Sequence, residues 1–169
     1  MVRGQNERQP SGSDRGFTII EVLVALTLIA IAAAGVADLC AIAIRSTRDA
    51  RDETMATLLA GQKIEQLQSA SWSSTDLMLS PPDTLASSVP GYAEYFDRHG
   101  RLLGGGAAPP PDAVYVRRWS IAAPSSGSPD TRVVRVLVAT TVRASQIGPA
   151  GPRARQAGEA LVVALRSGR

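Results

Sequence analysis

The distribution of apolar residues divides the chain into a polar start, a long apolar segment and a mixed remainder. Residues 1–16 are rich in Gly, Ser and Pro and show no apolar periodicity, which predicts a disordered leader. In residues 17–44 the only charged side chains are Glu21 and Asp38. A helix needs about 20 mostly apolar residues to cross a bilayer. Residues 17–44 are therefore predicted to form one membrane-spanning helix.

Beyond residue 44 the sequence becomes polar, but it keeps an apolar stripe. The stripe positions are three or four residues apart, which places them on one face of a helix: Ala56, Leu59, Ala60, Ile64 and Leu67. No helix breaker separates this segment from the apolar one, so one continuous helix is predicted from about Phe17 to about Ser69. Its first half, residues 17–44, suits lipid or similar helices. Its second half, residues 45–70, offers one face to a soluble domain.

Residues 71–169 combine loop and strand patterns and are predicted to form that soluble domain. Their Pro, Gly and Ser content predicts loops at residues 72–90, 104–112 and 123–129. Strand signals occur in a hairpin with its turn at residues 98–100 and in three later segments; the four segments are 92–103, 113–123, 131–142 and 159–166.

Alternation along these segments predicts which side chains share a face of the sheet. In residues 113–123, Tyr115, Trp119 and Ile121 alternate with Val114, Val116 and Arg118. In residues 131–142, one face is expected to carry Val134, Val136, Val138 and Val142. Three or four antiparallel strands are expected to form one small sheet, whose apolar face the striped helix half can cover. The predicted fold class is α+β, with a long N-terminal helix packed by its second half on a small antiparallel sheet.

Composition and charge narrow the classes of function that the protein can have, and they leave the predicted fold unchanged. A chain of 169 residues has room for a membrane anchor and a small domain, but not for a large enzyme. The net charge is +3, and Arg45, Arg48 and Arg51 alternate with acidic residues, which indicates a solvated helix face. No nucleic-acid partner is predicted.

The residues that most often carry chemistry form no catalytic or metal-binding pattern. Cys40 is the only cysteine, so it forms no intramolecular disulfide, and we expect it to be a small buried residue. His99 is the only histidine and is predicted to lie exposed in the hairpin turn. The triplet 104–106 precedes no phosphate-binding helix and is interpreted as a flexible loop. Five loop aspartates lack the ordered spacing of a calcium site: Asp76, Asp83, Asp97, Asp112 and Asp130. We predict no catalytic residue, cofactor or metal.

The segment RGFTIIEVLVALTLIAIAAAG, residues 15–35, resembles the N-terminal signature of type IV prepilins and type II secretion pseudopilins. The Gly16-Phe17 junction and Glu21 carry the resemblance. It implies a pilin-like fold, cleavage between Gly16 and Phe17 by a membrane-embedded prepilin peptidase, and methylation of the new amino terminus at Phe17. Residues 1–16 would then be the leader peptide.

The charge on Glu21 has a physical explanation in this setting. Cleavage frees an ammonium group on Phe17 at the start of the apolar helix, and Glu21 is the expected counter-ion. A charge at the bilayer centre costs about 2.5–3.5 kcal/mol, so such charges are usually paired and functional. The resemblance implies that the amine of one subunit pairs with this carboxylate of a neighbour, which makes Glu21 an assembly residue. The alternative is that Glu21 only reaches toward the lipid head groups.

Two other processing routes and the role of Asp38 are alternatives. Ordinary signal peptidase would cleave after Ala34, where Ala32 to Ala34 fits a site of small residues. A lipoprotein site at Cys40 is disfavoured by the bulky Leu39 before it. Asp38 is expected about 32 Å beyond Phe17, at the outer membrane interface. Between filament subunits it would instead need a partner such as Arg45 of a neighbour.

These observations favour a minor pilin or minor pseudopilin, and residues 53–68 resemble minor subunits of the PilV or GspI kind. The protein is expected to cross the inner membrane once, with a cytoplasmic amino terminus and an extracytoplasmic sheet domain. Its expected partners are the prepilin peptidase, other pilin or pseudopilin subunits, an inner-membrane assembly platform and membrane lipid. The alternative is a membrane-anchored extracytoplasmic binding module that enters no filament.

Overall fold

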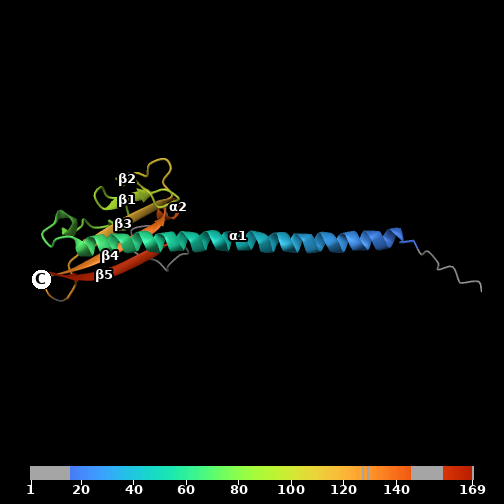
Figure 1. Ribbon diagram of the computed structural model, residues 1–169, viewed down its shortest axis with the longest axis horizontal. Helices are drawn as coiled ribbons and strands as arrows, with labels where there is room; N and C mark the ends of the chain where they lie inside the picture. The colour runs from blue at the N-terminus through green and yellow to red at the C-terminus, as the bar shows by residue number, and fades with distance from the viewer. Residues whose placement is uncertain (1–15, 127, 129, 146–157, 169) are drawn as a thin grey trace, which may run out of the picture. The chain divides into compact units, whose positions relative to one another are not determined.

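Helix α1, Ile19–Ser69, is the longest element of the chain (Figure 1). The computed structural model describes residues 16–126, 128, 130–145 and 158–168. The chain divides into two compact units, Met1–Ile44 and Arg45–Arg169, and α1 belongs to both. The predicted continuous helix is confirmed, with its start two residues later than expected. Most of the expected leader lies outside the described residues.

The part of α1 in the first unit is an apolar helix on which no other described segment of that unit packs. Every described residue of this unit is exposed, including Phe17 at 82% and Ile31 at 68%. Among the described residues, α1 is the helix long and apolar enough to cross a membrane. Cys40 is exposed too. Its expected burial is wrong for this unit, because no other described segment of the unit packs on the helix.

The second unit contains one antiparallel sheet with strand order β2-β1-β3-β4-β5. Its strands are β1 (Ala93–Phe96), β2 (Leu102–Gly105), β3 (Tyr115–Ala122), β4 (Thr131–Thr140) and β5 (Ala160–Ser167). All the predicted strand segments are present. The expected number of three or four strands is wrong, because both arms of the hairpin pair in addition to the three later strands.

Two local predictions are also wrong. Strand β4 ends at Thr140, and Val142 lies in the short helix α2 (Thr141–Ala144) with 71% of its surface exposed. The strand ends there because the chain turns into α2 at Thr141, whose N–H still donates to the Val114 carbonyl one residue before β3. Gly104 and Gly105 belong to β2 rather than to a loop. A Cβ on Gly105 would lie 2.8 Å from the Ala93 carbonyl oxygen, so glycine permits this close pairing.

The predicted stripe of α1 packs on one face of the sheet and forms the main core. All five stripe residues are buried, which confirms the periodicity argument. Their partners include Tyr115, Trp119 and Ile121 of β3, as predicted, and Val134, Val136 and Val138 of β4. Burial of each large apolar side chain contributes about 1.5–3 kcal/mol. The predicted α+β fold, with a long helix packed on an antiparallel sheet, is confirmed.

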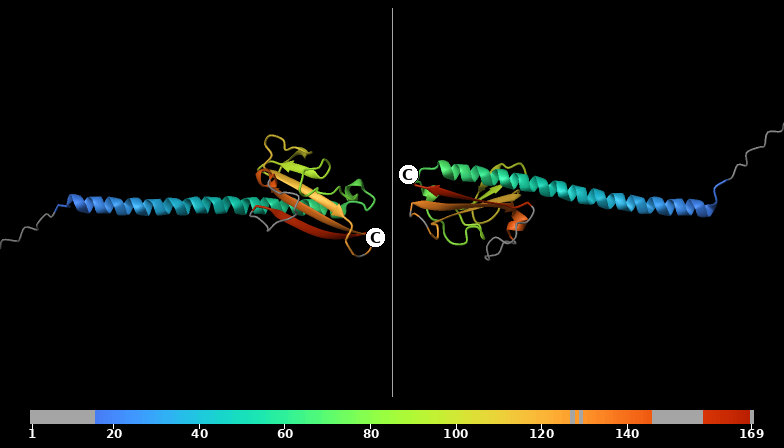
Figure 2. Two further views of the ribbon diagram at one scale, coloured as in Figure 1. Left: turned by 180° about the vertical axis from the view of Figure 1, so that it is seen from behind. Right: turned by 90° about the horizontal axis from the view of Figure 1, so that it is seen from below.

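The opposite face of the sheet is covered unevenly. A small second cluster consists of Tyr95, Val116, Ala139 and Ala144, and Ala144 belongs to α2. Figure 2 shows the short helix α2 beside the strands of the sheet. The loop at residues 72–90 contains a short 3-10 helix, η1 (Thr75–Leu77). This loop also covers part of the sheet edge, because the Ser80 N–H donates to the Ile121 carbonyl at 2.9 Å.

Polar contacts attach both ends of the packed half of α1. At its carboxyl end, the Arg166 guanidinium donates to the Leu67 and Ala70 carbonyls, which lack helical partners. Near its start, the Tyr115 hydroxyl donates to Asp52 Oδ1 at 2.7 Å. Burial and this hydrogen bond raise the pKa of Tyr115 to about 12.

Candidate functional site

The expected processing site lies just before α1. Gly16 and Phe17 are exposed and precede the helix, which starts at Ile19. Thr18 caps that helix: its Oγ1 accepts a hydrogen bond from the Glu21 N–H at 3.3 Å, and its carbonyl accepts one from the Val22 N–H at 3.2 Å. Exposed non-helical backbone of this kind is where proteases act most readily.

Sequence reasoning missed Thr18, although a signal for it was present. Thr18 and Glu21 have the spacing of a capping box, in which a Thr at the helix cap and a Glu three residues later satisfy free backbone N–H groups. The structure contains the first bond of that box. Glu21 is thereby held in the first helical turn rather than in the middle of the apolar segment.

The electrostatics of the helix start favour a carboxylate. The amino end of a helix carries roughly half a positive charge, so an anion in the first turn is stabilised there. An ammonium group on Phe17 would add a full positive charge at the same end. Glu21 is exposed, and the described residues contain no ion pair that involves it.

The two alternatives for Asp38 stay predictions. Asp38 and Arg45 are both exposed, in the first and second unit respectively. Neither forms an ion pair with another described residue. Arg48 and Arg51 are exposed as well, which confirms the solvated face expected for this part of α1.

A buried group of three charges joins α1 to the sheet in the second unit. Lys63 on α1 and Arg117 on β3 are only 4% and 6% exposed. Both contact Glu94 on β1: Lys63 Nζ lies 3.0 Å from Oε1, and Arg117 Nε donates to Oε2 at 2.9 Å. Arg117 also donates to the Leu59 carbonyl of α1 at 2.7 Å.

Aromatic rings and charge pairing offset the free-energy cost of burying this triad, Lys63, Glu94 and Arg117. Lys63 Nζ lies 3.7 Å from the ring centre of Trp119, and the Arg117 guanidinium carbon lies 4.6 Å from that of Phe96. Burial by itself raises the pKa of Glu94, but the hydrogen bonds and charges of Arg117 and Lys63 outweigh it and hold the pKa below its ordinary value. Glu94 is therefore ionised at neutral pH.

The triad, Lys63, Glu94 and Arg117, favours one position of α1 along the sheet. A shift of the helix along the sheet would bury Lys63 away from Glu94, and an unpaired buried charge is strongly unfavourable. Sequence reasoning did not identify it. The available signal was that Lys63, the only lysine, occupies a position on the apolar stripe, three residues after Ala60 and four before Leu67.

The candidate residues of the hairpin turn, His99 and Asp97, do not belong to the Lys63–Glu94–Arg117 triad. His99 is exposed in the hairpin turn, as predicted. Asp97 Oδ1 accepts the N–H groups of Arg101 and His99, at 2.9 and 2.8 Å, and the bond from Arg101 is the main cause of a lowered pKa at Asp97. In the described ranges, no group of three or more His, Cys, Asp or Glu residues is placed to hold a metal ion.

Helix α1 has a capped, apolar first half, and the apolar stripe of its second half packs on the antiparallel sheet. This arrangement defines a pilin-like α+β protein. Residues 12–37 match the family model of the prokaryotic N-terminal methylation motif. This match supports a type IV pilin-like or pseudopilin protein, a class whose members are typically structural subunits. The searches among curated proteins and among solved structures found no match.

Proposed function

We propose that this protein is a minor pilin or minor pseudopilin, cleaved after Gly16 and N-methylated on Phe17. In this proposal it assembles into, initiates or caps a type IV pilus or a type II secretion pseudopilus. The observation that carries the proposal is the methylation motif at residues 12–37. The structure adds an exposed Gly16-Phe17 bond directly before a capped apolar helix with Glu21 in its first turn.

The first step is maturation in the membrane. The precursor crosses the inner membrane once through residues 17–44, with its leader in the cytoplasm and its sheet domain outside. Prepilin peptidase cleaves the Gly16-Phe17 bond and methylates the new amino group. The exposed apolar surface of α1 in the first unit remains in lipid until it packs against the corresponding helices of other subunits.

The second step is assembly on an inner-membrane platform. Packing of apolar helix surfaces holds neighbouring subunits together, but it does not fix the axial displacement of one helix relative to the next. The pairing of the Phe17 amine with the Glu21 carboxylate of a neighbour would fix that displacement. The sheet domain, held on α1 by the Lys63–Glu94–Arg117 triad, would project from the fibre.

The intact mass of the protein purified from its native membrane tests this function. The expected mass corresponds to a chain that starts at Phe17 and carries one added methyl group. An uncut chain that begins at Met1, or a chain that starts at Gly35 after cleavage by signal peptidase, would contradict the proposal.

Replacement of Glu21 by Ala is expected to leave maturation intact and to reduce incorporation into filaments at least about tenfold. An unpaired charge costs about 2.5–3.5 kcal/mol at the bilayer centre and less near the end of a helix, and each 1.4 kcal/mol corresponds to about tenfold in an equilibrium. Incorporation is measured as the share of the protein in sheared or overproduced filaments. Val22→Ala is the matched control, because it shortens the adjacent side chain and keeps the carboxylate. Normal assembly of the Glu21 variant would disprove the pairing.

A further inference from the structure

A cavity of about 450 Å³ lies in the second unit, on the sheet face that α1 does not cover. The loop at residues 79–86 forms one wall, and β3, β4 and the start of β5 form the rest. Leu137 of β4 and Leu161 of β5 pair across the sheet and contribute to an apolar floor. This volume is within the range of ligand sites, roughly 300–1,000 Å³.

The loop wall is held in place by buried hydrogen bonds. Arg118, only 7% exposed, donates to the Leu85 and Ala86 carbonyls at 3.3 and 2.9 Å and to Ser88 Oγ at 3.1 Å. Ser80 Oγ accepts the Ile121 N–H at 3.0 Å at the other end of the loop. The cavity is therefore a preformed feature of the fold.

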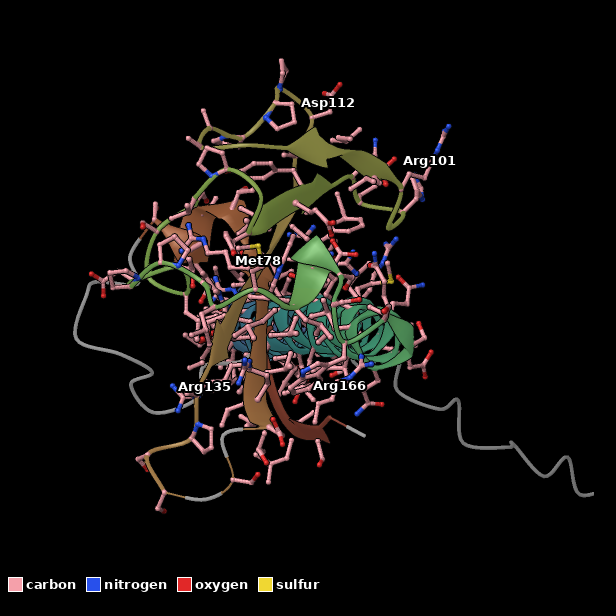
Figure 3. All side chains as sticks on the ribbon, turned by 90° about the vertical axis from the view of Figure 1, so that its left-hand side faces the viewer. Met78, Arg101, Asp112, Arg135 and Arg166 are labelled. Atoms are coloured by element: carbon pink, nitrogen blue, oxygen red, sulfur yellow. The ribbon has the colours of Figure 1, made fainter. Side chains whose placement is uncertain are left out.

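Three charged side chains line the cavity. Arg135 and Glu159 lie on the same sheet face as Leu137 and Leu161, and Asp83 lies on the opposite loop. Figure 3 shows Arg135 away from α1, whereas Arg166 lies against the helix. Among the described residues, none of the three has an ion-pair partner.

Arg135 and Glu159 are at opposite ends of the apolar floor. Arg135 is level with Val163 of β5, and Glu159 lies four residues before Val163, immediately ahead of the first residue of β5. Four strand residues span about 13 Å. An occupant that satisfies both charges therefore carries an acidic group and a basic group about 13 Å apart, with an apolar part between them. An extended peptide presents side chains four residues apart at this distance.

The edge of the sheet next to the cavity also favours a peptide. β5 pairs only with β4 within the described residues, which makes it an edge strand of the described sheet. On the same face as Leu161, Val163 is 56% exposed and Leu165 is 69% exposed. A bare apolar edge strand attracts added strands unless a partner covers it. A small amphiphile in the cavity would leave this edge uncovered.

We propose that the cavity and the edge of β5 bind an extended polypeptide segment of another protein. One apolar side chain of the segment enters the cavity, an acidic side chain contacts Arg135, and a basic side chain four residues away contacts Glu159. The proposal does not depend on filament formation, since it rests on the second unit alone.

Peptide binding to the ¹⁵N-labelled full-length protein in detergent micelles tests the site. The probes are three amidated pentapeptides with acetylated amino ends: Asp-Ala-Phe-Ala-Arg, Asp-Ala-Phe-Ala-Asp and Arg-Ala-Phe-Ala-Arg. The mixed peptide is expected to shift the amide signals of β5 and to bind up to about fivefold more tightly than either other peptide, as one exposed ion pair allows. Equal affinities, or no shifts at β5, would overturn the proposal.

Charge reversal in the protein gives a second, independent readout. Arg135→Glu should transfer the preference to the Arg-Ala-Phe-Ala-Arg peptide, and Glu159→Arg should transfer it to the Asp-Ala-Phe-Ala-Asp peptide. Arg98→Glu is the matched control, since Arg98 is exposed in the hairpin turn and does not line the cavity. An unchanged preference in both cavity variants, or binding of dodecanoate but of none of the peptides, would overturn the proposal.

Discussion

Gly16→Leu is expected to abolish maturation, so that the protein accumulates as the uncut precursor. A peptidase must bring its catalytic groups close to the backbone of the bond it cleaves, and only glycine leaves that approach open from every side. Among the described residues, no atom other than those of its chain neighbours lies within 4 Å of a Cβ built at Gly16. The leucine side chain therefore meets no described part of the protein, and the expected effect arises at the enzyme.

The measurement is the intact mass of each variant produced together with a prepilin peptidase. Gly35→Leu is the matched control, because among the described residues a Cβ at Gly35 meets nothing within 4 Å beyond its own stretch of helix, and this position is in the same apolar segment. The control should be processed to the mature form like the unchanged protein. Efficient processing of the Gly16 variant would refute the assigned cleavage site.

Glu94→Gln is expected to lower the free energy of unfolding of the second unit by about 3–5 kcal/mol, the usual effect of removing one partner from a buried ion pair. Glutamine keeps the shape of the side chain but leaves Lys63 and Arg117 buried without an anion. Denaturant titration of the full-length protein in micelles, followed by tryptophan fluorescence, measures the change. Trp119 lies directly against Lys63 and is a local reporter.

Glu65→Gln is the matched control for this experiment. Glu65 is an exposed acid on the same part of α1, so its neutralisation should change the stability by less than about 0.5 kcal/mol. Equal stabilities of the two variants would show that the triad does not hold the helix on the sheet.

The pH dependence of stability provides a further check on Glu94. Its pKa in the folded protein is lower than its ordinary value of 4.5. The stabilisation by its carboxylate is therefore fully present above about pH 4.5 and is lost as the pH falls through the lower folded pKa. The Glu94→Gln variant should lack this component of the acid destabilisation. An identical acid dependence in both proteins would contradict the role of the carboxylate.

Periodicity predicted the elements of this fold but not their long-range polar contacts. The stripe from Ala56 to Leu67 is buried as expected, because the side chains on the buried face of a helix recur with the helical period. Lys63 occupies the same stripe, and its partner Glu94 is 31 residues away. Spacing along one element contains no information about which residue of another element it meets.

Strand boundaries were predictable only approximately for a similar reason. Val142 continues the alternation of β4 in the sequence, but the strand ends at Thr140, because the chain turns into α2 at Thr141. Gly104 and Gly105 have a loop composition and still form a strand, since the hairpin register brings them against β1. In both cases the alternation or composition of the single segment does not show where the strand ends.

The sequence by itself determined the features whose chemistry is local. Gly16, Phe17, Thr18 and Glu21 are adjacent along the chain, so one short segment contains the expected cleavage site, the helix cap and the carboxylate. The tertiary structure alone decided the buried triad and the cavity on the far face of the sheet. The physical reason is that these sites join residues from distant segments, and only strand register and helix packing bring those residues together.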